Sequence, residues 1–131
     1  MFGEMLLKVS LFTLLNLQGI SSERAEKETN ALADSLRKIP LNIISEKHSE
    51  PGFPSFRKLA SLSAQSGTQY FFWGSLRQSG EKSYINLYFY DVSRSRKIKD
   101  FSMKCSLEFC SEEQFEILMN EIKSELKKQN L

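Results

Sequence analysis

The chain has 131 residues, of which 40% are hydrophobic and 26% are charged, and its formal net charge is +2. This length suits one domain with a sizeable core, so residues 1–131 are expected to form a single domain. A net charge so close to zero gives no electrostatic reason to expect nucleic acid or an anionic membrane as the main partner. No apolar run in the sequence approaches the roughly 20 residues that a membrane span needs.

The first candidate element covers residues 7–15, where leucine, valine and phenylalanine are mixed with lysine, serine and threonine. This mixture predicts a strand with substantial burial on both faces. The same stretch could be the apolar core of a signal peptide, with small residues near a cleavage point at residues 19–21. Glu4 ahead of the run and Lys8 inside it argue against that reading. A strand is therefore favoured, while a signal segment over residues 1–20 stays open.

A helix is expected after this strand. Ser21 or Ser22 can cap it, and it runs to about Lys38 with acidic side chains in its first turn and basic ones in its last, as the helix dipole favours. Pro40 ends the helix because proline cannot continue it. The apolar residues that follow, 41–45, predict a short second strand.

A second helix is expected to carry Pro54 in its first turn and to end at Gly67, since these positions suit a proline and a glycine. Three strands then follow in quick succession, over residues 68–77, 83–92 and 97–105. A polar loop that contains glycine joins the first two of them as a hairpin.

The last strand breaks the two-residue alternation of apolar side chains after Ile98, which predicts a bulge near Lys99 and Asp100. The segment from Ser111 to Gln114 has a capping-box pattern and opens the final helix. The element order is therefore β-α-β-α-β-β-β-α. This order predicts an α/β (α+β) domain with a mixed sheet of about five strands covered by three helices.

The two cysteines, Cys105 and Cys110, have four residues between them, which is not a zinc spacing, and the only histidine is His48. No metal site is expected from so few ligands. Two buried or half-buried free thiols are favoured for the cysteines. A short-loop disulfide is the alternative if the compartment is oxidising.

The sequence offers no catalytic constellation. His48 lies in a polar loop beside Glu46 and Glu50, and neither a glycine-flanked nucleophile nor a phosphate-binding glycine loop is present. The prediction is a protein that is not an enzyme and that has no cofactor. A nucleophile pair formed by Cys110 and His48 is the remaining enzymatic hypothesis.

One segment resembles a known family. Residues 66–82, SGTQYFFWGSLRQSGEK, lead from a small-residue helix end into a strand that reaches Gly-Ser-hydrophobic and then a polar hairpin. Residues 84–92, YINLYFYDV, form an alternating strand that ends in an aspartate, Asp91. This pattern resembles the amino-terminal domain of TolB-like bacterial proteins, relatives of CsgG-like and LpoB-like envelope proteins. The family usually places a glycine in the turn after the aspartate, and residues 92–96 have none, so this turn needs another conformation or an extra residue.

The resemblance implies a non-enzymatic adaptor or assembly module that contacts other proteins in a bacterial cell envelope. It implies an envelope or periplasmic location, while a cytoplasmic one stays open because the signal peptide is unclear. It implies structural roles for Asp91 and for Gly74, the latter through close backbone packing or a bulge. The partner is not identified, and a homo-oligomer is possible.

The strand over residues 83–92 has two different faces. One carries Ile85, Leu87 and Phe89 and is the natural core face, while the other is rich in tyrosine. Such a face is either an exposed binding platform or ordinary packing beneath the third helix. The candidate protein-interface residues are Trp73, Tyr84, Tyr88, Tyr90, Arg94 and Arg96.

A single-stranded nucleic-acid-binding domain is the second hypothesis. Tyrosines that stack on bases would act with a basic cluster over residues 94–99, near which Arg77 is also expected. The plain alternative for this cluster is a solvated turn. The last strand is expected at a sheet edge, where Lys97, Lys99 and Lys104 would protect it from unwanted pairing or flank a partner strand.

Overall fold

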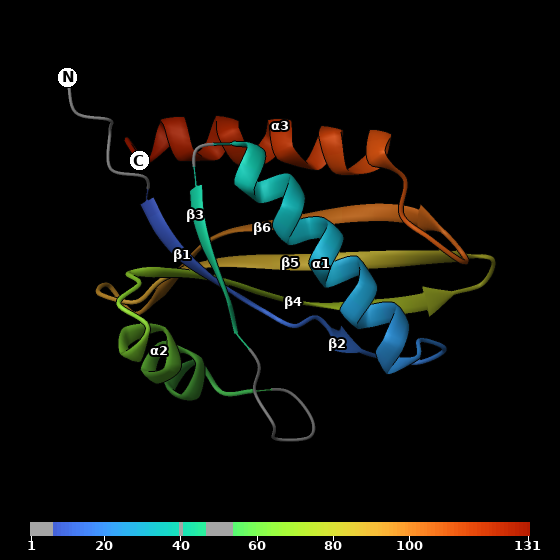
Figure 1. The fold of residues 1–131 in the computed structure, drawn as a ribbon, viewed down its shortest axis with the longest axis horizontal. Coiled ribbons are helices and arrows are strands. Elements are labelled where there is room, and N and C mark those ends of the chain that lie inside the picture. The colour runs from blue at the N-terminus through green and yellow to red at the C-terminus, as the bar shows by residue number, and fades with distance from the viewer. Residues whose placement is uncertain (1–6, 40, 47–53) are drawn as a thin grey trace.

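A computed structural model describes residues 7–39, 41–46 and 54–131 of the chain, and Figure 1 shows the arrangement of its elements. The predicted order of helices and strands is confirmed, with the first strand divided into two parts. His48 and Pro40 lie outside the described residues. The elements are β1 (Leu7–Phe12), β2 (Leu15–Asn16), α1 (Ser22–Lys38), β3 (Leu41–Glu46), α2 (Phe56–Gln65), β4 (Tyr70–Ser79), β5 (Lys82–Asp91), β6 (Arg96–Ser106) and α3 (Glu112–Lys128).

The strands form one mixed sheet in the order β3-β1-β4-β5-β6, and β2 extends the pairing of β4. β1 pairs in parallel with β3 and β4, whereas β4, β5 and β6 are antiparallel neighbours. β6 is an edge strand, as its lysines predicted. Within the described residues, no helix is long and apolar enough to cross a membrane.

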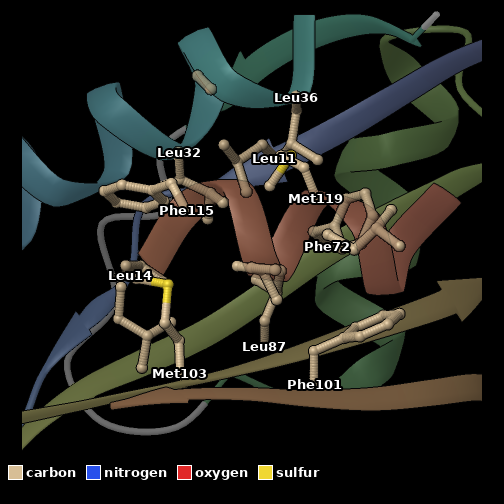
Figure 2. Close-up of a cluster of buried hydrophobic side chains, with 14 of the residues drawn as sticks. Leu11, Leu14, Leu32, Leu36, Phe72, Leu87, Phe101, Met103, Phe115 and Met119 are labelled. Atoms are coloured by element: carbon tan, nitrogen blue, oxygen red, sulfur yellow. The ribbon is translucent and has the colours of Figure 1, made fainter. Parts of the chain in front are cut away.

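The main core lies between the sheet and two helices, α1 and α3, which cover the same face (Figure 1). The predicted core face of β5 is confirmed, because Ile85, Leu87 and Phe89 are at most 1% exposed. Figure 2 shows leucines of α1 and Met119 of α3 meeting Leu87 and Phe101 of the sheet. α3 therefore does not cover the tyrosines of β5, which point to the other face.

The helix ends follow the local sequence closely. Ser21, Ser55 and Ser111 are the N-caps of α1, α2 and α3, and each side chain accepts a hydrogen bond from a backbone N–H in the first turn. The capping box of Ser111 with Gln114 is confirmed. The expected place of Pro54 in the first turn of α2 is wrong, because the cap at Ser55 starts the helix after it.

Hydrogen bonds to the Asp91 side chain stabilise the turn between β5 and β6, which contains no glycine. The Asp91 carboxylate accepts hydrogen bonds from the Ser93 hydroxyl at 2.8 Å and from the Arg94 backbone N–H at 3.2 Å. Ser95 takes the left-handed backbone conformation, with φ of 52°. Asparagine, aspartate and glycine are the residues that usually adopt this conformation, so a serine here depends on the surrounding hydrogen bonds.

The bulge in β6 lies one residue earlier than expected. Lys99 pairs with Phe89 and Lys97 pairs with Tyr90, which leaves Ile98 as the extra residue. Because Ile98 is the inserted residue, Lys97 pairs with Tyr90 and lies on the same face of the sheet as the tyrosines of β5.

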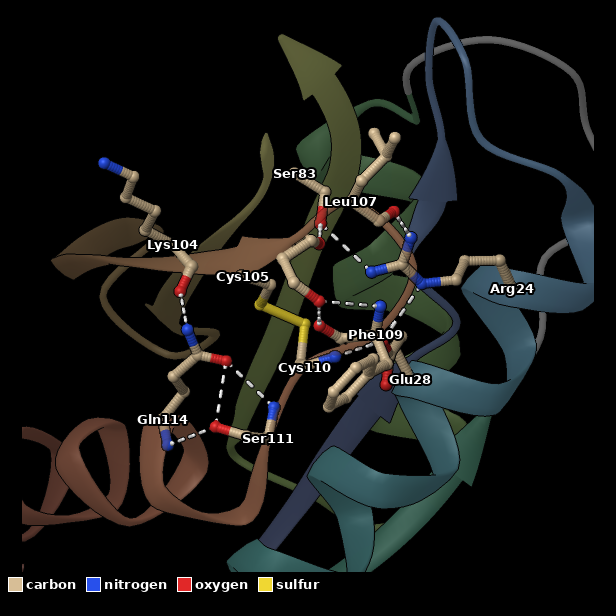
Figure 3. The surroundings of a disulfide bond; sticks show 11 residues. Arg24, Glu28, Ser83, Lys104, Cys105, Leu107, Phe109, Cys110, Ser111 and Gln114 are labelled. Carbon is tan, nitrogen blue, oxygen red and sulfur yellow. Dashed lines mark hydrogen bonds and ion pairs between the residues drawn. A yellow bond between two sulfur atoms is a disulfide. The ribbon is translucent and has the colours of Figure 1, made fainter. Parts of the chain in front are cut away.

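Cys105 and Cys110 form a disulfide (Figure 3), so the expectation of two free thiols is wrong. Their Cα atoms lie 4.8 Å apart because the chain reverses between β6 and α3. Glu28 of α1, 2% exposed, fixes this reversal by accepting a hydrogen bond from the Cys110 N–H at 2.9 Å. The Arg24 guanidinium reaches the same Glu28 oxygen at 3.0 Å, so the buried carboxylate is paired.

β4 and β5 approach each other closely at Gly74. A Cβ atom at this position would lie 2.1 Å from the backbone oxygen of Asn86 on β5. Replacing Gly74 with alanine is therefore expected to lower the free energy of unfolding by about 3 kcal/mol, because the two strands would have to separate. Urea unfolding measures this change.

Gly80→Ala is the matched control. No atom lies within 4 Å of its added Cβ, and only the positive φ of 63° opposes alanine there. Its expected cost is about 1 kcal/mol. Equal costs for the two variants would contradict the close approach at Gly74.

Candidate protein-interaction surface

The side of β4, β5 and β6 that faces away from α1 and α3 is named the aromatic face here. Strand register divides it into rows, each of which crosses the three strands. From one end to the other, the rows are Phe71-Tyr90-Lys97, Trp73-Tyr88-Asp100, Ser75-Asn86-Ser102, Arg77-Tyr84-Lys104 and Ser79-Lys82-Ser106.

α2 covers the first of these rows. Phe56 of α2 contacts Phe71 and Tyr90, with ring centroids 5.8 and 5.3 Å away, and Phe71 is fully buried. Phe71 and Tyr90 themselves stack with their centroids 5.2 Å apart. Tyr90 is half-buried and packs, as Trp73 also does, against a second, smaller core beneath α2.

The second row lies at the border of this core. The rings of Trp73 and Tyr88 are 4.8 Å apart, and both side chains are half-buried. Lys97 lies 5.7 Å from the Tyr88 ring and 2.7 Å from Asp100. The hydrogen bond to Asp100 raises the pKa of Lys97, so this lysine stays charged throughout the physiological range. Its charge is balanced locally by Asp100.

The last two rows form an open, basic end. Arg77 lies over the half-buried Tyr84 ring at 5.3 Å, and Lys104 pairs with Tyr84 from the other side. Lys82 precedes Tyr84 by two residues and so points to the same face. The side chains of Arg77, Lys82 and Lys104 are exposed, so Tyr84 stands among three cations.

Of the six predicted interface residues, the structure pairs Trp73 with Tyr88, places Tyr84 two rows away on the same face, and packs Tyr90 against Phe56 of α2. Arg94 belongs to the β5–β6 turn at the covered end and lies 3.6 Å from the Asp91 carboxylate, and Arg96 begins β6 at the same end.

The expectation that Arg77 lies near the basic cluster of this turn is wrong. The hairpin register instead places Arg77 beside Tyr84, at the opposite end of β5. Sequence reasoning also missed Lys82 and Lys104 as neighbours of Tyr84. The two-residue alternation of Lys82 and Tyr84 was the available signal for the first of them.

The described residues contain no group of three histidine, cysteine, aspartate or glutamate side chains that could hold a metal ion. The Sγ atom of Cys110 is bonded to Cys105, so in this state Cys110 has no thiol for a nucleophile pair with His48.

No protein-family model and no curated protein sequence matches this chain. Solved structures do match it. The C-terminal domain of LpoB from Salmonella enterica has a TM-score of 0.62 and 13% identity, over 79% of this chain and 86% of that one. A PelC dodecamer from Paraburkholderia phytofirmans has a TM-score of 0.61 and 12% identity, over 95% and 93%.

TolB from Acinetobacter baumannii has a TM-score of 0.59 and 13% identity, over 94% of this chain but only 29% of TolB. The chain therefore has a TolB/LpoB-like fold, as residues 66–92 predicted. At these identities the likeness is one of fold.

Tyr84 and Tyr90 are expected to differ sharply in their contribution to stability. Tyr90→Ala removes a ring packed between Phe56 and Phe71, so the expected loss is about 3 kcal/mol of unfolding free energy. Tyr84→Ala removes a half-buried ring whose described ring contact is with the exposed Arg77 side chain, so a loss below about 1 kcal/mol is expected. Thermal or urea unfolding of both variants checks this, and similar losses would contradict the division of the aromatic face into a covered and an open part.

Proposed function

We propose that this chain, with its TolB/LpoB-like fold, is a non-enzymatic protein-interaction module of a bacterial cell envelope, acting there as an adaptor or assembly component. It binds its partner through the open part of the aromatic face, by which we mean the rows beyond the one that α2 covers. The observation that carries the proposal is the half-buried Trp73–Tyr88 pair, with half-buried Tyr84 two rows farther along, on a sheet face that α2 covers at one end only.

The composition of this surface suits protein recognition. Tryptophan, tyrosine and arginine dominate the binding energy of protein interfaces because each combines a large contact area with a polar tip. Here the Trp73–Tyr88 pair and the Arg77–Tyr84 pair lie on the same face of two paired strands, with the Ser75–Asn86 pair between them. Strands hold these side chains in place before binding, which lowers the entropy lost on association.

The disulfide supports an envelope location. Structural disulfides form and persist in oxidising compartments such as the periplasm and are rare in the cytosol. Cys105 is 1% exposed and Cys110 is 9% exposed, so this bond lies within the structure between β6 and α3. The resemblance of residues 66–92 to envelope proteins points to the same compartment.

Single-stranded nucleic acid is a weaker candidate ligand. The three cations around Tyr84 favour it, since such binders combine stacking platforms with phosphate contacts. The basic cluster of the β5–β6 turn does not help, because Arg94 faces Asp91 and Lys97 is bonded to Asp100. Tyr90, the third stacking residue that this hypothesis needs, lies beneath Phe56.

A pull-down from nuclease-treated extracts of native cells tests the proposal. The bait is the tagged full chain with its disulfide intact, and the comparison is Tyr84→Ser combined with Tyr88→Ser. The wild type is expected to retain a defined protein that the double variant retains about tenfold less, because two central aromatic contacts are lost.

Ile117→Ser is the control for this experiment, since Ile117 is 56% exposed on α3, away from the aromatic face. It is expected to retain the same protein as the wild type. Equal retention by all three baits, or salt-sensitive binding of single-stranded oligonucleotides in place of a protein, would overturn the proposal.

A further inference from the structure

The loop between β6 and α3, residues 107–111, displays two large apolar side chains. Leu107 is 39% exposed and Phe109 is 52% exposed (Figure 3). The disulfide joins Cys105 and Cys110, the two ends of the segment that carries these side chains. Within it, the Ser106 hydroxyl donates to the Phe109 carbonyl at 2.7 Å and accepts from the Phe109 N–H at 3.3 Å.

Arg24 of α1 also holds this loop in place. Its guanidinium donates to the Leu107 carbonyl at 2.5 Å and to the Ser83 hydroxyl of β5 at 3.0 Å, as Figure 3 shows. A loop fixed at so many points loses little conformational entropy when a partner covers it. We name the loop, with Phe109 at its centre, the knob.

The opposite end of the molecule carries an apolar pocket of about 470 Å³. This size lies within the roughly 300–1,000 Å³ of pockets that enclose small ligands, so a phenyl ring fits. The pocket is lined by Leu7, Leu41, Leu126 and Leu131 together with Lys123, Ser124 and Lys127.

The knob and the pocket lie at the two ends of α3. Figure 1 shows this helix running along the sheet from the β6–α3 loop to the side where β1 begins. Its 17 residues span about 25 Å, so the knob of one molecule cannot reach its own pocket. A second copy of the chain can present its knob to that pocket.

The charges around the two features are complementary. Exposed Glu108, Glu112 and Glu113 surround the knob, and Lys123 and Lys127 line the pocket. Acids in the first turn of a helix and bases in its last turn are usual because of the helix dipole. Glu108 and Lys123 lie outside these turns, so the dipole does not account for them.

We propose that the chain associates with itself head to tail, with the Phe109 knob of one copy in the leucine-lined pocket of the next and with glutamates facing lysines around the contact. Such a heterologous contact produces a closed ring or an open chain, according to the rotation between neighbours. The contact leaves the open part of the aromatic face free, so it does not rest on the proposed function.

Sedimentation velocity of the oxidised full chain over a range of concentrations tests this proposal. The wild type is expected to form concentration-dependent oligomers. Phe109→Ser is expected to raise the dissociation constant by about 10- to 100-fold, because it removes a ring buried in the contact. Ile117→Ser, a similarly exposed apolar residue on the middle of α3, is the matched control and is expected to associate as the wild type does.

Complementation distinguishes a head-to-tail contact from a symmetric one. Phe109→Ser retains the pocket, and the combination of Lys123→Glu with Lys127→Glu retains the knob. At a concentration where the wild type is oligomeric, each variant alone is expected to be monomeric. An equal mixture is expected to form dimers that do not extend further, since the intact knob of one variant can bind the intact pocket of the other. Charge reversal at the knob, Glu108→Lys with Glu112→Lys, is expected to restore binding to the reversed pocket.

Three results would overturn the proposal: a wild type that stays monomeric at every concentration, a Phe109→Ser variant that associates as tightly as the wild type, or mixtures that remain monomeric. Unfolding midpoints and the absence of free thiols establish that the variants are folded, and the charge-reversed pairs provide the test if Phe109→Ser is not. The Tyr84 and Tyr88 variants are expected to associate normally, so failure here and failure of the proposed function give different results.

Discussion

The rest of this structure depends on one constraint: α1 and α3 cover one face of the sheet, whereas α2 covers only one end of the other face. The ten residues of β5 extend over about 33 Å, whereas the ten residues of α2 make a helix of about 15 Å. Two helices of 17 residues close the opposite face. The rings of the aromatic face consequently differ in their surroundings. Phe71 and Tyr90 lie beneath α2, Trp73 lies at the border of the same core, and Tyr88 and Tyr84 lie beyond it and are half-buried.

The same constraint explains where the polar interactions that stabilise the fold are located. At the end of the sheet farthest from α2, the Arg24–Glu28 pair and the Cys105–Cys110 bond join α1, β5 and the start of α3. At the other end, Asp91 stabilises a turn without glycine. The middle of this sheet face carries the half-buried rings of Trp73 and Tyr88 beside the exposed Lys97–Asp100 ion pair, and such a group of rings is the pattern of a surface that a partner covers.

Local sequence patterns predicted the element order, the capping box and the inner face of β5, because each depends on neighbours within a few residues. The disulfide could not be read from spacing, since the reversal that joins Cys105 to Cys110 is fixed by Glu28, 82 positions from Cys110. Which face α3 covers is a property of chain topology, not of its own periodicity. The placement of Arg77 beside Tyr84 required the hairpin register, which the loop length sets.

The central claim is that a partner protein covers the open part of the aromatic face. The most direct measurement is site-specific photo-crosslinking in native cells, with a benzophenone amino acid at position 84 or 88 and, for comparison, at the exposed position 121 of α3. The account predicts that one protein is crosslinked from both sheet positions and not from position 121. Crosslinks from position 121 alone, or none from either sheet position, would contradict it.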